Sequence, residues 1–179
     1  MRIISGQFKG RRIQAPQNLP VRPTTDFARE ALFNILNHLI DFQQVKVVDL
    51  FSGTGAISLE LASRGCPHIV AVDAHFGCVQ FLKKMADELE IKSISAIKKD
   101  VFSFLKSEIS KEMDLVFADP PYDLPTLEKI PDAVFSTAIL KESGFLILEH
   151  SQKNNFEHHP FFLEHRKYGN VNFSLFQKQ

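Results

Sequence analysis

Asp119-Pro120-Pro121-Tyr122 is the stretch of this sequence whose residue types are best suited to chemistry. It directly follows residues 113–118, a mostly apolar run that predicts a buried strand ended by the prolines. Two consecutive prolines fix the backbone and remove two N–H donors, so the turn presents carbonyl acceptors beside a carboxylate and an aromatic ring. Ligands of open α/β sheets bind outside the carboxyl ends of the strands. We therefore expect this turn to bind a planar group that carries an NH₂.

The chemistry that such a turn could perform concerns the exocyclic amine of a nucleobase. This amine is a poor nucleophile because its lone pair is delocalised into the ring. If the Asp119 carboxylate and the Pro120 carbonyl each accept one N–H, the lone pair is localised, and Tyr122 stacked on the base would align the nitrogen with an electrophile. The same acceptors would stabilise the charge that develops on nitrogen. Taken alone, the stretch is equally compatible with a structural turn.

A glycine-rich turn between a predicted strand and a predicted helix indicates a second ligand site. Residues 45–50 have the near-continuous apolar character of a central parallel strand, and apolar residues recur at helical spacing soon afterwards. Gly53 and Gly55 let the backbone approach a ligand closely, beside the free N–H groups of a helix start. Ser58 occupies the third position of a GxGxxG pattern and no Gly-Lys-Ser/Thr follows, so the turn is neither a complete dinucleotide fingerprint nor a P-loop.

Acidic residues end the next two predicted strands. Asp73 lies about twenty residues after the glycines. A site for a dinucleotide and a site for S-adenosylmethionine would both have an acid at this position, where it binds the ribose hydroxyls. Asp100 could accept from an adenine NH₂ while the amide of Val101 meets a ring nitrogen. Both acids have a structural alternative, because each could instead cap the helix that follows it.

The whole pattern alternates between strands and helices, which predicts an α/β fold with a parallel sheet. Thr25 or Asp26 would cap the first helix, and Pro131 would break the last one. The expected strands are 45–50, 68–72, 95–99, 113–118 and 145–150, and the expected helices cover 28–39, 57–62, 77–90, 102–109 and 126–140. Residues 163–168 and 171–177 are expected to form a closing antiparallel pair around Gly169-Asn170.

Composition is that of a soluble protein with one sizeable core. The chain has 179 residues, 44% of them hydrophobic, and no apolar run approaches the roughly 20 residues of a membrane span. Cys66 and Cys78 form no CxxC or metal-ligand spacing, so reduced thiols in a cytosol are expected. The pair His158-His159 lacks further ligand spacing, and no metal site is expected.

A net charge of zero conceals a basic N-terminus. Residues 1–25 hold five basic residues and no acidic one, whereas the remainder holds 16 basic and 21 acidic residues. Residues 1–16 are expected to form a β-hairpin, with strand-like pieces at 2–5 and 11–14, that could bind a phosphate backbone. Phe8 could stack on RNA bases or could fold back onto the body. The residues expected to contact RNA are Arg2, Phe8, Lys9, Arg11, Arg12 and Arg22. We expect residues 1–20 to form a basic extension and residues 21–179 a single domain.

The order of the motifs resembles that of the class I S-adenosylmethionine-dependent methyltransferases. These motifs are residues 49–55, then Asp73, Asp100 and Asp119-Pro120-Pro121-Tyr122. The last motif is typical of the subset that methylates exocyclic amines. The stretches 2–6 (Arg-Ile-Ile-Ser-Gly), 9–11 (Lys-Gly-Arg) and 22–34 (beginning Arg-Pro-Thr-Thr-Asp) are similar to those of bacterial 16S ribosomal RNA guanine-N2 methyltransferases of the RsmD type. This resemblance runs nearly from end to end of the chain.

The resemblance implies a Rossmann-like, mostly parallel seven-stranded sheet with a reversed final strand and an N-terminal hairpin. It implies S-adenosylmethionine as the cofactor, and guanine N2 held by Asp119 and the Pro120 carbonyl beside Pro121 and Tyr122. The residues expected at the cofactor are Thr24, Asp49, Phe51, Gly53, Gly55, Asp73, Asp100 and Val101. Asp73 stands where the family more often has Glu, and its shorter side chain reaches less far toward the ribose.

The implied protein is a cytoplasmic rRNA (guanine-N2-)-methyltransferase. We expect a monomer that acts on 16S ribosomal RNA, free or in a 30S assembly intermediate, without a membrane or a metal. Other functions fit parts of the pattern. A DNA adenine-N6 methyltransferase and a protein glutamine methyltransferase share the Asp-Pro-Pro-Tyr motif, although the latter leaves the basic N-terminus without a role. An RNA-binding assembly factor without catalysis is also possible, whereas a nicotinamide dehydrogenase lacks the third glycine.

Overall fold

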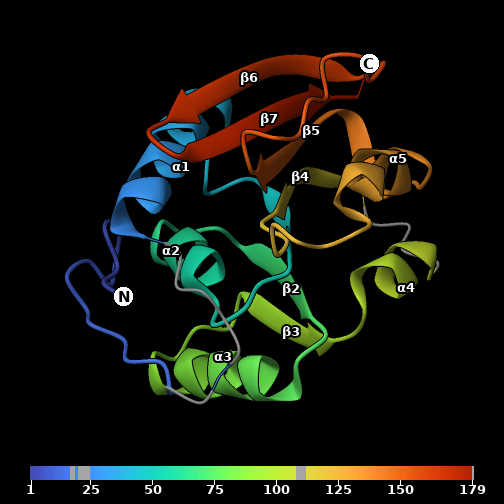
Figure 1. Ribbon diagram of the computed structural model, residues 1–179. Helices are drawn as coiled ribbons and strands as arrows, with labels where there is room; N and C mark the ends of the chain where they lie inside the picture. Colours follow the sequence, from blue (N-terminus) through green and yellow to red (C-terminus); the bar gives the residue numbers. More distant parts are fainter. Residues whose placement is uncertain (17–18, 20–24, 108–111, 179) are drawn as a thin grey trace.

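Strands and helices alternate along most of the chain in the computed structural model, which describes residues 1–16, 19, 25–107 and 112–178 (Figure 1). The elements in order are α1 (Asp26–Leu39), β1 (Lys46–Leu50), α2 (Ala56–Ser63), β2 (His68–Asp73), α3 (Phe76–Glu88), β3 (Ile94–Lys98), α4 (Val101–Lys106), β4 (Met113–Ala118), the 3₁₀ turn η1 (Leu127–Lys129), α5 (Ile130–Phe135), β5 (Leu140–His150), β6 (Phe162–Tyr168) and β7 (Val171–Gln177).

All seven strands belong to one sheet, in the order β3-β2-β1-β4-β5-β7-β6. The first five strands of this order pair in parallel, whereas β7 runs antiparallel to both β5 and β6. The expected α/β fold with a mostly parallel seven-stranded sheet and a reversed final strand is therefore confirmed. The chain moves outward from β1 through β2 to β3 and then returns to place β4 on the other side of β1. Such a reversal opens a crevice at the carboxyl ends of the strands.

Helices cover both faces of the sheet because successive residues of a strand point to opposite sides. In β1, Val47 packs with α1 and α2, whereas Val48 packs with α4 and α5. Leu115 and Val116 divide in the same way in β4. α3 joins α1 and α2 on their face, and Figure 1 shows α4 and α5 on the other side of the sheet. Each predicted strand thus carries the apolar residues of two separate cores.

The N-terminal segment, defined here as residues 1–13, lies on the α2 and α3 side of the molecule. Its two arms pair antiparallel through one bridge between Arg2 and Arg12, and the N–H of Ile3 donates to the carbonyl of Arg11 at 3.0 Å. No regular strand forms, because the carboxylate of Glu60 in α2 accepts the N–H groups of residues 4 and 5, at 2.7 and 3.0 Å. The pairing of the expected hairpin is present, and its strands are reduced to a bridge. The side chains of Ile3 and Ile13 are buried against α2 and α3.

Gly6 fixes this segment to α2, and its replacement provides a test of the docking. Gly6 has φ +80°, and an added Cβ would lie 1.8 Å from the carbonyl oxygen of Ser63. Gly10 has φ +85°, but an added Cβ there meets no atom within 4 Å. We expect Gly10→Ala to lower the unfolding free energy by about 1–2 kcal/mol, the cost of a left-handed alanine. Gly6→Ala should lower it by about 3 kcal/mol or more, since the clash with Ser63 is added.

Urea denaturation of the two variants measures this difference, and Gly10→Ala serves as the control for backbone strain. Equal losses in the two variants would contradict the close contact between the N-terminal segment and α2.

Several boundaries differ from the prediction, and the helix expected to reach 140 ends at Phe135. Pro131 does not break a helix but lies in the first turn of α5, where its missing N–H has no helical acceptor in any case. β5 begins at Leu140 rather than at 145, with a register shift against β4 between Met113 and Leu115. α4 ends at Lys106, and residues 108–111 of the helix expected to reach 109 lie outside the described residues. The antiparallel pair around Gly169 is confirmed, with Tyr168 opposite Val171.

None of the helices in the described part of the chain is long and apolar enough to cross a membrane.

Candidate active site

A cavity of about 710 Å³ lies at the carboxyl ends of the central strands. Its walls include residues that follow β1, β2, β3 and β4, and the end of β5. Six of the eight residues expected at the cofactor line it, namely Asp49, Phe51, Gly53, Asp73, Asp100 and Val101. All four residues of the turn at 119–122 line it as well. The turn at 119–122 and the glycine-rich turn after β1 therefore share one cavity.

The turn after β1 is tightly curled by positive φ angles. Phe51 has φ +62°, although it is not glycine, and Gly53 and Gly55 have φ +53° and +79°. Such a conformation at a non-glycine residue costs of order 1–3 kcal/mol and is concentrated at functional sites. Gly55 is not among the residues that line the cavity. A Cβ there would lie 2.3 Å from Cδ1 of Leu82, so glycine is needed for helix packing.

Asp73 is held firmly between two loops. One carboxylate oxygen accepts the N–H of Gly53 at 2.8 Å, and the other accepts the N–H of His75 at 2.7 Å. The structural alternative for Asp73 is wrong, since His75 is the residue that caps α3, through its ring nitrogen and the N–H of Cys78. The donation from Gly53 also places a carboxylate where a phosphate would sit in a nucleotide-binding turn. The turn therefore does not favour an anionic ligand.

Asp100 caps a helix and also faces the cavity. Its carboxylate accepts the N–H of Ser103 at 2.8 Å and so caps α4, and the residue also lines the cavity with Val101. A carboxylate offers about four acceptor positions, so the cap leaves capacity for a ligand NH₂.

The cavity is strongly acidic. No Lys or Arg occurs among the described residues that line it. Six acidic residues line it, namely Asp49, Asp73, Asp100, Asp119, Asp123 and Glu149. This charge favours a cationic ligand and opposes a phosphate-rich one.

Asp49 has the most perturbed titration in this cluster. Burial raises the pKa of its carboxyl group from 3.8 to about 7. The Ser58 hydroxyl donates to this carboxylate at 2.5 Å and opposes the rise in pKa. The negative charges of Asp119 and Asp73 add to the rise. A raised pKa means that the folded protein holds a proton that the unfolded chain releases above pH 4. The unfolding free energy contributed by Asp49 therefore falls as the pH rises from about 4 to about 7.

We expect Asp49→Asn to remove this dependence, because Asn keeps the size and a hydrogen-bond acceptor but cannot ionise. The variant should be more stable than the wild type above pH 7, by at most about 4 kcal/mol, and the two should converge near pH 4. Chemical denaturation of both proteins at several pH values measures the difference. A difference that stays constant from pH 4 to pH 8 would show that Asp49 ionises normally.

The turn at 119–122 is tied to β1 and to β5. The N–H of Asp119 approaches the carbonyl of Leu50 at 3.4 Å, and the hydroxyl of Tyr122 donates to a carboxylate oxygen of Glu149 at 2.9 Å. Asp119 is half-buried, Pro120 is buried and Tyr122 is 39% exposed. The turn thus places a carboxylate inside the cavity and an aromatic ring at its edge.

Among the cavity residues that sequence reasoning missed, His75 and Glu149 carry side chains suited to chemistry. Both carry a signal that could have found them, since each lies at or just after the carboxyl end of a predicted strand. His75 follows Asp73 by two residues, and Glu149 lies near the end of the strand that neighbours the one before Asp119.

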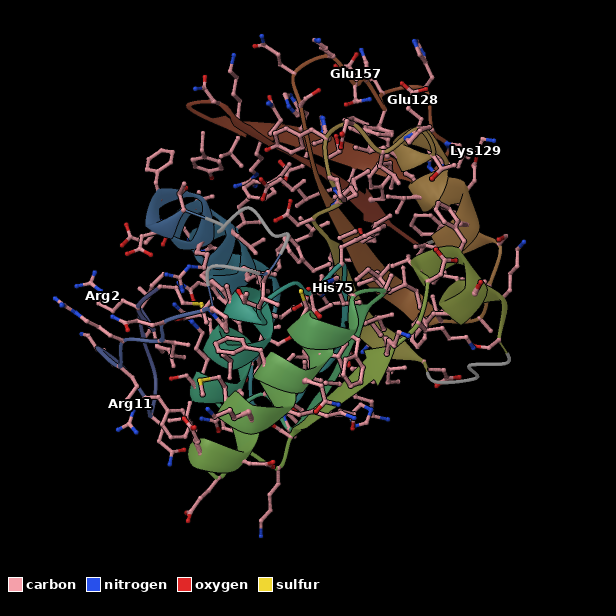
Figure 2. All side chains as sticks on the ribbon, turned by 60° about the horizontal axis from the view of Figure 1, so that its bottom comes forward. Arg2, Arg11, His75, Glu128, Lys129 and Glu157 are labelled. Carbon is pink, nitrogen blue, oxygen red and sulfur yellow. The ribbon has the colours of Figure 1, made fainter. Side chains whose placement is uncertain are left out.

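The cations of the N-terminal segment are exposed. Arg2 and Arg11 project outward from it in Figure 2, on the opposite side of the view from Glu128 and Lys129. Lys9 and Arg12 are also exposed. Phe8, by contrast, is half-buried against the α2 and α3 core, which matches the alternative in which it folds back onto the body. An apolar ring gains more from this contact than from exposure to water.

Arg29 connects the N-terminal segment to the cavity. Its side chain is fully buried, pairs with Asp26 and donates to the carbonyl of Arg2 at 2.8 Å. Arg29 therefore has a structural role as an ion-pair partner of Asp26. The preceding residue, Ala28, lines the cavity, as does the helix cap Thr25. Two other predicted contacts, Arg22 and Thr24, lie outside the described residues.

Cys66 and Cys78 are buried and not bonded to each other. Within the described ranges, no group of three or more His, Cys, Asp or Glu residues is arranged to hold a metal ion.

Comparison with known proteins gives consistent matches. Residues 1–177 match the family described as "Conserved hypothetical protein 95". The protein YlbH of Bacillus subtilis (strain 168) is 33% identical over 156 residues, which cover 86% of this chain and 84% of that protein. "Ribosomal RNA small subunit methyltransferase D" of Escherichia coli (strain K12) is 29% identical over 182 residues, which cover 100% of this chain and 90% of that protein.

A solved structure shares the fold at lower identity. It is the Thermus thermophilus 16S rRNA N2 G1207 methyltransferase (RsmC) in complex with AdoMet and guanosine. It superimposes with a TM-score of 0.72 at 21% identity and covers 90% of this chain and 45% of that one.

Proposed function

This chain belongs to the family described as "Conserved hypothetical protein 95", whose pattern it matches over residues 1–177, and on that premise we propose that it methylates N2 of a guanine in 16S ribosomal RNA, with S-adenosylmethionine as the methyl donor. The observation that carries the proposal is that the Asp119–Tyr122 turn and the Asp73–Gly53 turn open into the same cavity. A relative named for small-subunit ribosomal RNA methylation supports the substrate. A protein of the same fold, solved with AdoMet and guanosine, supports this pair of ligands.

The cavity fits S-adenosylmethionine by its charge and by the positions of its acidic residues. The cofactor carries a sulfonium and an ammonium group, both of them cationic. The cavity favours such groups, because acidic residues line it and no Lys or Arg occurs among its described lining residues. Asp73, fixed by Gly53 and by the residue that caps α3, would bind the ribose hydroxyls. Asp100 and Val101, which line the cavity, would contact the adenine edge. A dinucleotide fits less well, because the amide of Gly53 is already bonded to a carboxylate.

The chain's own residues would prepare the target amine. Bound S-adenosylmethionine supplies an electrophilic methyl group. The Asp119 carboxylate and the Pro120 carbonyl would accept the two N–H bonds of guanine N2 and localise its lone pair, while Tyr122 would hold the base plane. When the methyl group passes from sulfur to nitrogen, the nitrogen would lose one proton, and Asp119 would accept it. No covalent intermediate with the protein is required.

The RNA must deliver an unstacked guanine to this cavity, as enzymes that act on bases require. We propose that Arg2, Lys9, Arg11 and Arg12 bind the phosphate backbone near its mouth, because the carbonyl of Arg2 contacts the α1 residue next to Ala28. All the residues proposed for both ligands come from one chain, so the reaction needs no second copy. With ribosomal RNA as its substrate, the protein would act in the cytoplasm, on free 16S RNA or on a 30S assembly intermediate.

The test is transfer of labelled methyl groups from S-adenosylmethionine to naked 16S RNA, partly assembled 30S particles and duplex DNA, in parallel. We expect N2-methylguanosine in digests of the RNA, and comparison of the first two substrates identifies the preferred particle. Label in DNA adenine would instead support an adenine-N6 methyltransferase. RNA binding without any transfer would support an assembly factor that lacks catalysis.

A further inference from the structure

Glu149 and Asp119 occupy adjacent positions at the ends of two neighbouring strands. β4 and β5 pair in parallel with Ala118 opposite Leu148, so the next residues, Asp119 and Glu149, follow side by side. Both line the cavity, and Glu149 is only 6% exposed. Burying a carboxylate near another carboxylate is unfavourable unless hydrogen-bond donors compensate it. The hydroxyl of Tyr122 is one such donor, at 2.9 Å.

The edge of guanine offers a matching donor. Guanine carries N1–H beside its N2 amine, so its edge presents N–H donors on two nitrogens that are both bonded to C2. Adenine and cytosine carry a ring nitrogen acceptor beside their amine instead. Two adjacent carboxylates at the amine-binding turn therefore complement guanine, whereas they would confront the lone pair of an adenine ring nitrogen.

We infer that Glu149 selects guanine by accepting its N1–H while Asp119 and the Pro120 carbonyl hold N2. The inference rests on the proposed function and deepens it, since it names the residue that distinguishes guanine from adenine. A carboxylate has about four acceptor positions, so donation from Tyr122 and from a base are compatible. The Tyr122 hydrogen bond orients the carboxylate of Glu149 and links base recognition to the ring that holds the base plane.

The experiment compares two RNA substrates that differ at N1 and at the neighbouring C6. The guanine that the wild type methylates is replaced by 2-aminopurine, which keeps the 2-amine but has an N1 acceptor in place of N1–H and a hydrogen in place of O6. The loss of O6 is the same for every variant, so the change in preference between the wild type and Glu149→Gln reports on N1. We expect the wild type to prefer guanine by about 100-fold or more in kcat/KM, because a site built for a donor leaves its acceptor unpaired when that donor is missing. In Glu149→Gln, whose amide can present a donor to N1 of 2-aminopurine, the preference should fall to about 10-fold or less.

Tyr122→Phe is the matched control, because it removes the donor to Glu149 and keeps the aromatic ring. It should slow methylation of both RNAs and leave Glu149 able to discriminate between them. If Glu149 merely anchors Tyr122, then Glu149→Gln will behave like Tyr122→Phe, with both rates lowered and the preference unchanged, and the inference is wrong. Calorimetric S-adenosylmethionine affinity and the melting temperature show whether each variant is folded.

The outcomes separate the inference from the proposed function. A wild-type protein that methylates guanine and 2-aminopurine equally overturns the role of Glu149 and leaves the enzyme intact, even if Glu149→Gln does not fold. A wild-type protein that methylates no guanine in 16S RNA, naked or assembled, overturns both.

Discussion

Asp119→Ala is expected to lower the rate of methyl transfer to 16S RNA by about 10²–10³-fold, the loss typical of removing one preorganised partner of a developing charge. The affinity for S-adenosylmethionine should stay within about threefold of the wild type. This separation follows from position, since Asp119 belongs to the β4 turn, whereas Asp73, Gly53 and Asp100, which are proposed for the cofactor, follow other strands.

Two further variants sharpen this prediction. Asp119→Asn keeps an oxygen acceptor but loses the charge, so it should retain more activity than Asp119→Ala and fail chiefly in stabilising the developing positive charge. Glu128→Ala removes an equal charge at an exposed site of η1, far from the N-terminal segment in Figure 2, and should leave the rate unchanged. Single-turnover assays separate the chemical step from binding. Unchanged single-turnover rates in Asp119→Ala would remove the turn from the mechanism.

The central part of the site could be predicted because its signals are local. The two prolines after 113–118 fix both the end of a strand and the shape of the turn, whatever surrounds them. The same holds for the glycine turn after β1 and for Asp73 at the end of β2. A parallel sheet then brings these strand ends to one edge. Motifs 46 residues apart, at Asp73 and Asp119, could thus be placed in one cavity from sequence alone.

The missed features depend on contacts between distant residues. Glu149 belongs to no motif in the sequence, and its position beside Asp119 follows only from the β4–β5 register. Gly55 matches a cofactor motif, yet its lack of a side chain serves the contact with Leu82 of α3. Glu60 lies buried in α2 and accepts two N–H groups from the N-terminal segment, 55 and 56 residues away in sequence. No periodicity or spacing rule reports such pairings.

Contacts between distant residues also anchor the basic N-terminus to the body of the protein. Charge counting predicts an extension, but Ile3 and Ile13 enter the core, and Arg29 pairs with Asp26 while donating to the carbonyl of Arg2. The cations are therefore held on a fixed surface rather than on a free arm. Ordered cations lose less conformational entropy when they bind a phosphate backbone, which favours binding in a defined orientation.

Replacing Lys9, Arg11 and Arg12 with Ala should weaken RNA binding by about 10–100-fold at 0.1 M salt, because counterion release supplies much of the affinity. The slope of log K against log salt concentration should fall by about one unit for each phosphate group that the variant no longer binds. Filter binding or fluorescence anisotropy over a range of salt concentrations measures both quantities. The matched control replaces Lys106, Lys129 and Lys153, which are also exposed and carry the same total charge elsewhere on the molecule.

The control distinguishes a specific surface from a general effect of charge. If both triple variants lose the same affinity, net charge alone attracts the RNA and the N-terminal segment has no special role. If only the N-terminal variant loses affinity, and its single-turnover rate at saturating RNA equals that of the wild type, the segment binds RNA and leaves the chemistry to the cavity. That result requires the RNA to touch two surfaces at once. The fixed docking of residues 1–13 on α2, through Glu60 and Gly6, then sets where the guanine meets Asp119.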